Sequence, residues 1–176
     1  MRWVGRHRLA TSVLAVLVVF VLVTARLFVW PPTDDPAPVD AIVALGGDPG
    51  QIEAQRALAL AQQGYGDTVV VSRGGYPPAP CPPAPDKVRV ICFRADPLNT
   101  RGEAEYVARL AAARHWRRLM VVPATTQTTR ARLLFERCTG VDLRFVPVRG
   151  PLWRLAYQVA YEWGALLKAL TLHRSC

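Results

Sequence analysis

From residue 40 onward, short apolar runs alternate with longer stretches of helical periodicity, and this alternation restricts the fold more than any other feature of the chain. The expected strands are residues 41–45, 68–72, 88–93, 119–122 and 142–148. The expected helices are residues 51–63, 100–114, 127–138 and 152–172. Strands that alternate with helices form a parallel sheet with both faces covered. The pattern therefore predicts an α/β fold, a Rossmann-like three-layer sandwich around a five-stranded parallel sheet.

The N-terminal thirty residues have the character of a membrane segment. Residues 13–23 contain no polar side chain, and Arg2, Arg6 and Arg8 precede them. With its flanking residues the apolar run reaches about 17 positions, the short end of a transmembrane helix, and Trp30 suits the membrane interface. The positive-inside rule places the N-terminus in the cytoplasm. We therefore predict a single-pass plasma-membrane protein whose remaining chain is extracytoplasmic.

A cleaved signal peptide is the alternative interpretation of the same segment, because Thr24 and Ala25 are small enough for a cleavage site. Both interpretations export the rest of the chain. Residues 31–38 contain four prolines and two acidic residues and are expected to form a semi-rigid spacer. The predicted organisation is thus a cytoplasmic tail with an anchor or signal peptide at 1–30, the spacer, and an exported α/β domain at 39–176.

The formal net charge of +9 does not indicate nucleic-acid binding. The bases are 20 Arg and only 2 Lys, so arginine is frequent throughout the chain, and residues 1–30 alone contribute +4. No nucleic-acid-binding motif is recognisable, and the domain is predicted to be exported. A hydrophobic content of 51% also excludes an intrinsically disordered chain.

Polar and glycine-rich segments follow four of the expected strands. They are Gly46-Gly47-Asp48, Ser72-Arg73-Gly74-Gly75, Asp96-Pro97-Leu98-Asn99-Thr100 and Ala124-Thr125-Thr126-Gln127. The loops at the opposite ends of the strands have no comparable run of small, hydroxyl and amide residues. Open parallel sheets bind ligands beyond the carboxyl ends of their strands, so these segments predict a ligand site.

Two arginines near helix starts indicate an anionic ligand. Arg101 lies in the first turn of its predicted helix, and Arg130 lies about one turn into the next. A cation near a helix N-terminus opposes the helix dipole by about 0.3–1 kcal/mol. A bound anion would reverse that cost, because backbone donors and positive charge would converge on it. Chance placement in an Arg-rich chain is the alternative.

Structural roles are also open for the neighbouring motif residues. Gly46-Gly47 would fit a tight strand-to-helix turn as well as an anion cradle. Thr100 and Glu103 have the T-x-x-E spacing of a capping box, and Thr125 or Thr126 is placed to cap the following helix.

No catalytic residue can be assigned, and whether the protein is an enzyme stays open. Ser72 has no neighbouring His, and His115 falls at the wrong end of the sheet. Hydrolysis would need a carboxylate from Asp48, Asp96 or Glu103. No metal site is expected, since the chain has no C-x-x-C motif and no clustered histidines.

The four cysteines fit an oxidising compartment. Cys81 and Cys92 bracket a proline-rich excursion and are expected to form a disulfide that closes a short loop. Cys138 and Cys176 either pair, if the last helix folds back, or stay free.

Several of these segments together resemble the YdcF/SanA/ElyC-like family of bacterial envelope-associated proteins. The resemblance covers roughly residues 39–148, and the topology of one N-terminal anchor and an exported domain is also similar. The matching segments are Asp40-Ala-Ile-Val-Ala-Leu-Gly-Gly-Asp48, Arg56, Val71-Ser-Arg-Gly-Gly75, Asn99-Thr-Arg-Gly-Glu-Ala104 and the segment through Arg130-Ala131.

The resemblance implies a Rossmann-like fold, a role in cell-envelope or peptidoglycan biogenesis, and a nucleotide-like ligand such as S-adenosylmethionine. It also implies a set of pocket residues: Gly46, Gly47, Arg56, Ser72, Gly74, Asn99, Thr100, Glu103, Thr125 and Arg130. Gln127 stands where the family usually has His. Glutamine can hydrogen-bond a ligand but cannot carry a proton near neutral pH, so this difference bears on catalysis more than on binding.

The sequence therefore favours a membrane-anchored envelope protein that binds an anionic ligand containing a phosphate or a nucleotide. Its partners would be membrane lipid and a polyprenyl phosphate or a cell-wall intermediate. The alternative function is a non-catalytic scaffold or interaction module at the membrane surface, which would act through the amphipathic helix at 152–172.

Overall fold

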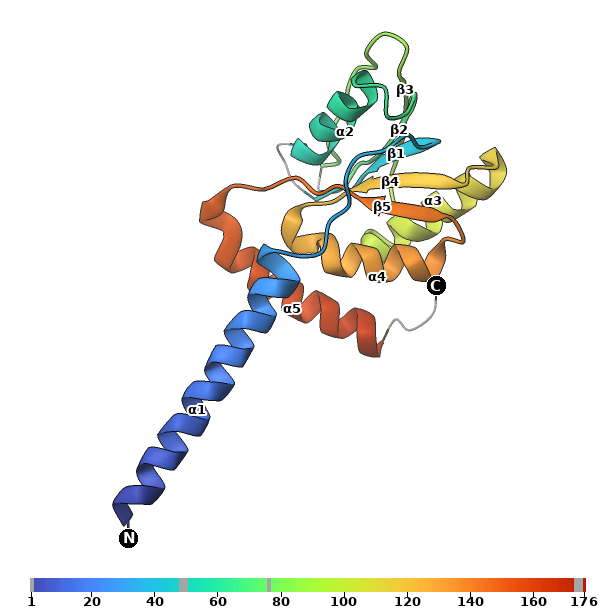
Figure 1. The fold of residues 1–176 in the computed structure, drawn as a ribbon. Coiled ribbons are helices and arrows are strands. Elements are labelled where there is room, and N and C mark those ends of the chain that lie inside the picture. Colours follow the sequence, from blue (N-terminus) through green and yellow to red (C-terminus); the bar gives the residue numbers. More distant parts are fainter. Residues whose placement is uncertain (1, 48–50, 76, 173–175) are drawn as a thin grey trace.

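The computed structural model describes residues 2–47, 51–75, 77–172 and 176 and confirms the predicted α/β fold. Five parallel strands form one sheet in the order β3-β2-β1-β4-β5 (Figure 1). The strands are β1 Ala41–Ala44, β2 Thr68–Ser72, β3 Arg89–Phe93, β4 Arg118–Val122 and β5 Asp142–Phe145. The chain adds β2 and β3 on one side of β1 and then β4 and β5 on the other. The loops after β1 and β4 therefore diverge between these two strands, as in doubly wound folds.

The helices also follow the predicted pattern. They are α1 Arg2–Thr24, α2 Ile52–Gln62, α3 Thr100–Arg114, α4 Thr128–Cys138 and α5 Leu155–Thr171. Three short elements adjoin them: the π-helix η1 Ala25–Val29, and the 3₁₀ turns η2 Thr125–Gln127 and η3 Leu152–Arg154. The bounds of α3 are those expected from the sequence. The last strand is shorter than predicted, because pairing with β4 ends at Phe145 and continues only as an isolated bridge between Ala124 and Val148.

Alternate residues of the central strand serve opposite faces of the sheet. In β1, Ala41 and Val43 belong to the core under α3 and α4, whereas Ile42 and Ala44 belong to the core under α2. All four are fully buried. A strand that is covered on both sides has no polar face, which is why the central strands are almost continuous apolar runs.

The last helix adds a further element outside the three layers. Helix α5 packs against α4 and η2, with Leu166 and Ala169 buried (Figure 1). A disulfide between Cys138 at the end of α4 and Cys176 ties the C-terminus to this part of the domain. The predicted disulfide between Cys81 and Cys92 is also present.

The N-terminal helix projects from the domain as a single long rod (Figure 1). Its segment Thr11–Val29 is 19 residues long, has a mean hydropathy of 2.7 and is almost entirely exposed, so it could cross a membrane. At its domain end, η1 packs against η2 and α4, and Phe28 is fully buried. The Thr129 hydroxyl donates a hydrogen bond to the Leu27 carbonyl.

The proline-rich segment 31–38 runs along the edge strand β5. Asp34 donates its N–H to the Phe145 carbonyl (2.9 Å) and accepts the Phe145 N–H on its side chain (2.8 Å). Arg132 forms an ion pair with the same carboxylate at 2.9 Å. Burial acts to raise the pKa of Asp34, but the Phe145 N–H and Arg132 outweigh it and lower this pKa overall. The segment thus joins the anchor to the domain through a specific contact.

Candidate functional site

A pocket of about 690 Å³ lies at the carboxyl ends of the strands, where the sequence predicts a ligand site. Its walls come from the segments that follow β1, β2, β3 and β4, and from η3 and the first half of α5. The lining residues from the sheet side are Gly46, Gly47, Glu53, Gly74, Gly75, Ala95, Leu98, Asn99, Thr100, Glu103, Ala124, Thr126, Gln127 and Arg130. Those from the C-terminal side are Trp153, Arg154, Tyr157, Gln158, Tyr161 and Glu162.

The glycine segments after β1 and β2 cross at very short range. A Cβ on Gly46 would lie 2.8 Å from the Gly74 nitrogen, and a Cβ on Gly74 would lie 2.9 Å from the Gly47 nitrogen. The Gly46 N–H donates to Glu103 Oε1 at 2.8 Å. This donor is therefore already bonded to a carboxylate of the protein, which supports the turn interpretation of Gly46-Gly47 over the anion cradle.

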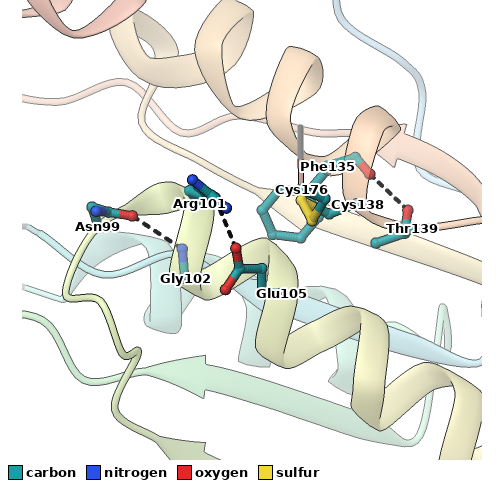
Figure 2. The surroundings of a disulfide bond; sticks show 8 residues. All are labelled: Asn99, Arg101, Gly102, Glu105, Phe135, Cys138, Thr139 and Cys176. Carbon is teal, nitrogen blue, oxygen red and sulfur yellow. Dashed lines mark hydrogen bonds and ion pairs between the residues drawn. A yellow bond between two sulfur atoms is a disulfide. The ribbon is translucent and has the colours of Figure 1, made fainter. Parts of the chain in front are cut away.

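The start of α3 is capped by Asn99, not by a capping box. The Asn99 side chain accepts the Gly102 N–H at 3.0 Å, as Figure 2 shows. The capping-box interpretation of Thr100 and Glu103 is thus wrong, because Thr100 is the first helical residue. Both side chains are instead buried and point into the site, where they contact other elements.

Glu103 is a buried carboxyl group at the floor of the pocket. Its burial raises its pKa above the ordinary value of 4.5, and bonds from the Gly46 N–H and the Thr100 hydroxyl, with the charge of Arg130, offset this only in part. The Ser72 hydroxyl is buried beside this carboxylate without a hydrogen-bond partner and also acts to lower its pKa. Glu103 thereby links three of the strand-end segments.

Arg130 forms a two-point ion pair with Glu162 across the α4–α5 contact. Its Nε lies 2.7 Å from Oε2 and its second terminal nitrogen lies 2.7 Å from Oε1. Burial acts to lower the pKa of Arg130, but the hydrogen bonds and charge of Glu162 outweigh this and raise it. The prediction that Arg130 faces the site is supported, but its charge is already balanced by a carboxylate that the sequence did not indicate.

Thr100 connects this ion pair to the floor of the pocket. Its hydroxyl oxygen accepts hydrogen bonds from Arg130 at 2.7 Å and from the Gln127 side-chain amide at 2.9 Å. Gln127 is buried, and its amide is used as a donor to Thr100. Gln127 is therefore part of a hydrogen-bond network and has no titratable proton.

Eight of the predicted site residues line this pocket. They are Gly46, Gly47, Gly74, Asn99, Thr100, Glu103, Gln127 and Arg130. Ser72 is buried beside them at the end of β2. Asp48 lies outside the described residues. Asp96, the other carboxylate considered for catalysis, is not among the residues that line the pocket.

Three further predicted residues, like Ser72, are not among those that line the pocket. Arg101 forms an ion pair with Glu105 at 2.8 Å, one turn further along α3 (Figure 2). The Thr125 hydroxyl bonds to the Val148 carbonyl at 3.1 Å, and Arg56 is half-buried on α2. The two arginines near helix starts thus differ, because Arg130 lines the pocket whereas Arg101 pairs within its own helix.

Sequence reasoning missed the contribution of the C-terminal helix to the pocket. Tyr157, Gln158, Tyr161 and Glu162 form one wall, and Arg154 lies over the Trp153 ring at 4.5 Å from its centroid. The four-residue spacing of Trp153, Tyr157 and Tyr161 indicates that they share one helix face. It does not indicate that this face covers the strand ends, because the position of α5 depends on its packing against α4. Glu53 on α2 was also missed, although it is buried in the first turn of a predicted helix.

Comparisons of the chain with protein-family models, curated proteins and solved structures find no match. Among the described residues, no group of three or more His, Cys, Asp or Glu side chains is placed to hold a metal ion. The arrangement is best suited to binding, because its buried polar side chains form a connected network and its wall carries three aromatic rings and two arginines.

Proposed function

We propose that this protein is a membrane-anchored, extracytoplasmic binding protein that holds an anionic, phosphate- or nucleotide-containing ligand in the pocket at the strand ends. The resemblance of its sequence to the YdcF/SanA/ElyC-like family supports a role in cell-envelope or peptidoglycan biogenesis as part of this proposal. The observation that carries the proposal is the position of Arg130, whose guanidinium forms part of the pocket wall and is held by Thr100 and Glu162.

The proposed location rests on two features. The apolar segment Thr11–Val29 is long enough to span a bilayer, and arginines at positions 2, 6 and 8 favour a cytoplasmic N-terminus. Both disulfides fit an oxidising compartment outside the cytoplasm. Trp163 stacks on Phe20 and its Nε1 donates to Thr24 Oγ1 at 3.3 Å, and these contacts to residues before the possible cleavage site favour an uncleaved anchor over a removed signal peptide.

The proposed ligand class follows from what can compete for Arg130. A guanidinium binds carboxylates and phosphates in the same two-point geometry, and here Glu162 occupies that position. A phosphate that enters the pocket can replace the Glu162 carboxylate on Arg130. It would accept hydrogen bonds from the same two guanidinium nitrogens that now donate to Glu162. Arg154 provides a second positive charge in the wall.

Trp153, Tyr157 and Tyr161 supply flat faces beside these charges, and all three are largely exposed within the pocket wall. Aromatic faces of this kind stack on a nucleobase or a sugar ring. A ligand that combines a ring with a phosphate would therefore use both the charged and the aromatic part of the pocket.

No reaction is proposed for the site. Glu103 is the one carboxylate from the predicted candidates that lies in the described pocket, and it is buried under the Gly46 N–H. Gln127 cannot act as a proton carrier. The residues present support binding and orientation of a ligand.

The test is a thermal-shift screen of the full chain in detergent micelles. The probes are inorganic phosphate, a nucleoside diphosphate, S-adenosylmethionine and farnesyl phosphate as a short polyprenyl phosphate. A phosphate-containing probe should raise the unfolding temperature of the wild type and of Arg101→Gln, but not that of Arg130→Gln. Arg101 is the matched control, because it is an arginine near a helix start that pairs outside the pocket. Equal stabilisation of Arg130→Gln would contradict the proposal.

A further inference from the structure

Helix α5 carries an apolar stripe that is separate from its pocket-facing side. The stripe consists of Ala156, Ala160, Trp163, Leu167 and Leu170, at successive spacings of four, three, four and three residues. Residues at these spacings share one face of an α-helix. Leu167 is 54% exposed and Leu170 is 44% exposed, although α5 belongs to the folded domain. An apolar helix face left uncovered in this way marks a binding surface.

One member of the stripe contacts the candidate membrane helix. The Trp163 ring stacks on Phe20 with centroids 5.6 Å apart and meets the edge of Phe28 at 5.3 Å. Its Nε1 lies 3.3 Å from Thr24 Oγ1. All three partners belong to the apolar segment Thr11–Val29. The stripe is therefore continuous with the surface of that segment.

We propose that this stripe docks α5 onto the bilayer that α1 crosses, with its apolar side chains at the boundary between headgroups and acyl chains. The proposal rests on the membrane anchoring given under Proposed function. The residues that Trp163 contacts extend from Phe28 to Phe20, and the middle one, Thr24, is five residues before Val29, which corresponds to about 7–8 Å along a helix. If lipid surrounds Phe20, then the Trp163 ring stacked on it lies at the level of the same lipid.

The geometry of the domain agrees with this placement. Helix α5 lies on the side of the domain from which α1 projects (Figure 1). The stripe includes Trp163, which contacts α1, whereas Tyr157 and Tyr161 on an adjoining face of the helix line the pocket. Glu162 points inward to Arg130. The same helix thus provides a bilayer-facing stripe and a wall of the pocket.

A consequence follows for the ligand site. Docking of α5 holds the pocket wall beside the lipid headgroups, so an anionic group carried by a membrane lipid can reach Arg130 without leaving the bilayer surface. An apolar helix face that lies in a membrane interface typically enters it by about 5–10 Å, which is sufficient for leucine side chains to reach the acyl region.

The test measures the depth of nitroxide labels on the full chain reconstituted into vesicles of phosphatidylcholine and phosphatidylglycerol. Single cysteines are introduced in place of Leu167 and, as a second stripe position, Leu170, with both native disulfides intact. Ala113→Cys on the exposed side of α3 is the domain control, and Val19→Cys on α1 is the membrane control. Circular dichroism checks that each labelled protein keeps its fold.

The expected result is an oxygen-to-nickel-chelate accessibility ratio that is several-fold higher at 167 and 170 than at 113, and approaches the ratio at 19. Ratios at 167 and 170 equal to that at 113 would show that the stripe faces water, and would overturn the docking proposal. Loss of access to both reagents at 167 and 170 would show that protein covers the stripe, for example a second copy of the chain, and would also overturn it. A water-like ratio at 19 would instead refute the membrane anchor itself.

Discussion

Arg130 on α4 and Glu162 on α5 form a buried ion pair in which two nitrogens of the guanidinium each lie 2.7 Å from a different carboxylate oxygen. The two side chains are 32 residues apart in the sequence and hold α5 against the carboxyl ends of the strands. The pair therefore closes the pocket structurally and at the same time provides the charged group that a ligand would meet.

Removal of one partner of this pair should destabilise the domain strongly. Arg130→Met leaves a buried Glu162 carboxylate without its cation, and the expected loss is about 3–5 kcal/mol in the free energy of unfolding. Denaturant unfolding of the full chain in micelles measures it. The double variant Arg130→Met/Glu162→Leu should lose much less, since neither charge is left alone. A double variant that is as unstable as the single one would contradict this account of the pair.

Glu103 should make the stability of the protein depend on pH. Its pKa in the folded state is raised above 4.5, so the folded protein binds this proton more tightly than the unfolded chain does. Stability from this group is therefore present at low pH and is lost as the pH rises from about 4.5 through the folded-state pKa.

The variant Glu103→Gln tests this dependence. It keeps an oxygen that can accept the Gly46 N–H but has no titratable proton. The free energy of unfolding of the variant minus that of the wild type should be larger at pH 8 than at pH 4. Denaturant unfolding of both proteins at each pH measures this difference. A stability difference that is the same at both pH values would show that Glu103 is not responsible.

Gly102 should tolerate no side chain. A Cβ at this position would lie 2.0 Å from the Pro97 carbonyl oxygen in the segment between β3 and α3. Gly102→Ala should therefore destabilise the domain by at least the 1–3 kcal/mol or so that is typical of overpacking. Gly164→Ala is the matched control on α5, where nothing lies within 4 Å, and should stabilise the helix by about 0.5–1 kcal/mol. Equal effects of the two substitutions on the unfolding temperature would contradict the contact.

The two disulfides should contribute unequally. The bond between Cys138 and Cys176 spans 38 residues and that between Cys81 and Cys92 spans 11. Chain entropy predicts losses of about 4 and about 3 kcal/mol when each loop is opened. Unfolding of the double-serine variant of each pair measures the difference, with peptide mapping as the check that the other bond is intact. A larger loss from the shorter loop would contradict this order.

The layered fold could be predicted because buried strands and covering helices leave strong local patterns. The apolar runs around Ile42 and Val70 are continuous since both faces of the sheet are covered, and α3 has the predicted bounds Thr100–Arg114. The end of β5 could not be predicted, because it depends on where β4 stops pairing. The apolar pattern of residues 145–148 is typical of a strand and of a buried loop alike, so it does not distinguish the two.

The candidate site was predicted in part. The strand-end segments lie together because the topology of a parallel sheet requires it. Arg101 was predicted as a site residue but does not line the pocket, and Glu105 four residues later has the spacing of the common i, i+4 ion pair that the two form. Glu162 gave no local signal, since its role depends on the packing of α5 onto α4.

If an anion that enters the pocket competes with Glu162 for Arg130, titration calorimetry with inorganic phosphate will detect the competition. The full chain in micelles is compared with Glu162→Gln, which removes the competing charge but keeps the side-chain volume. Phosphate should bind Glu162→Gln about tenfold more tightly than the wild type, a difference of about 1.4 kcal/mol, and should not bind Arg130→Gln. Equal affinities of all three proteins for phosphate would contradict this competition.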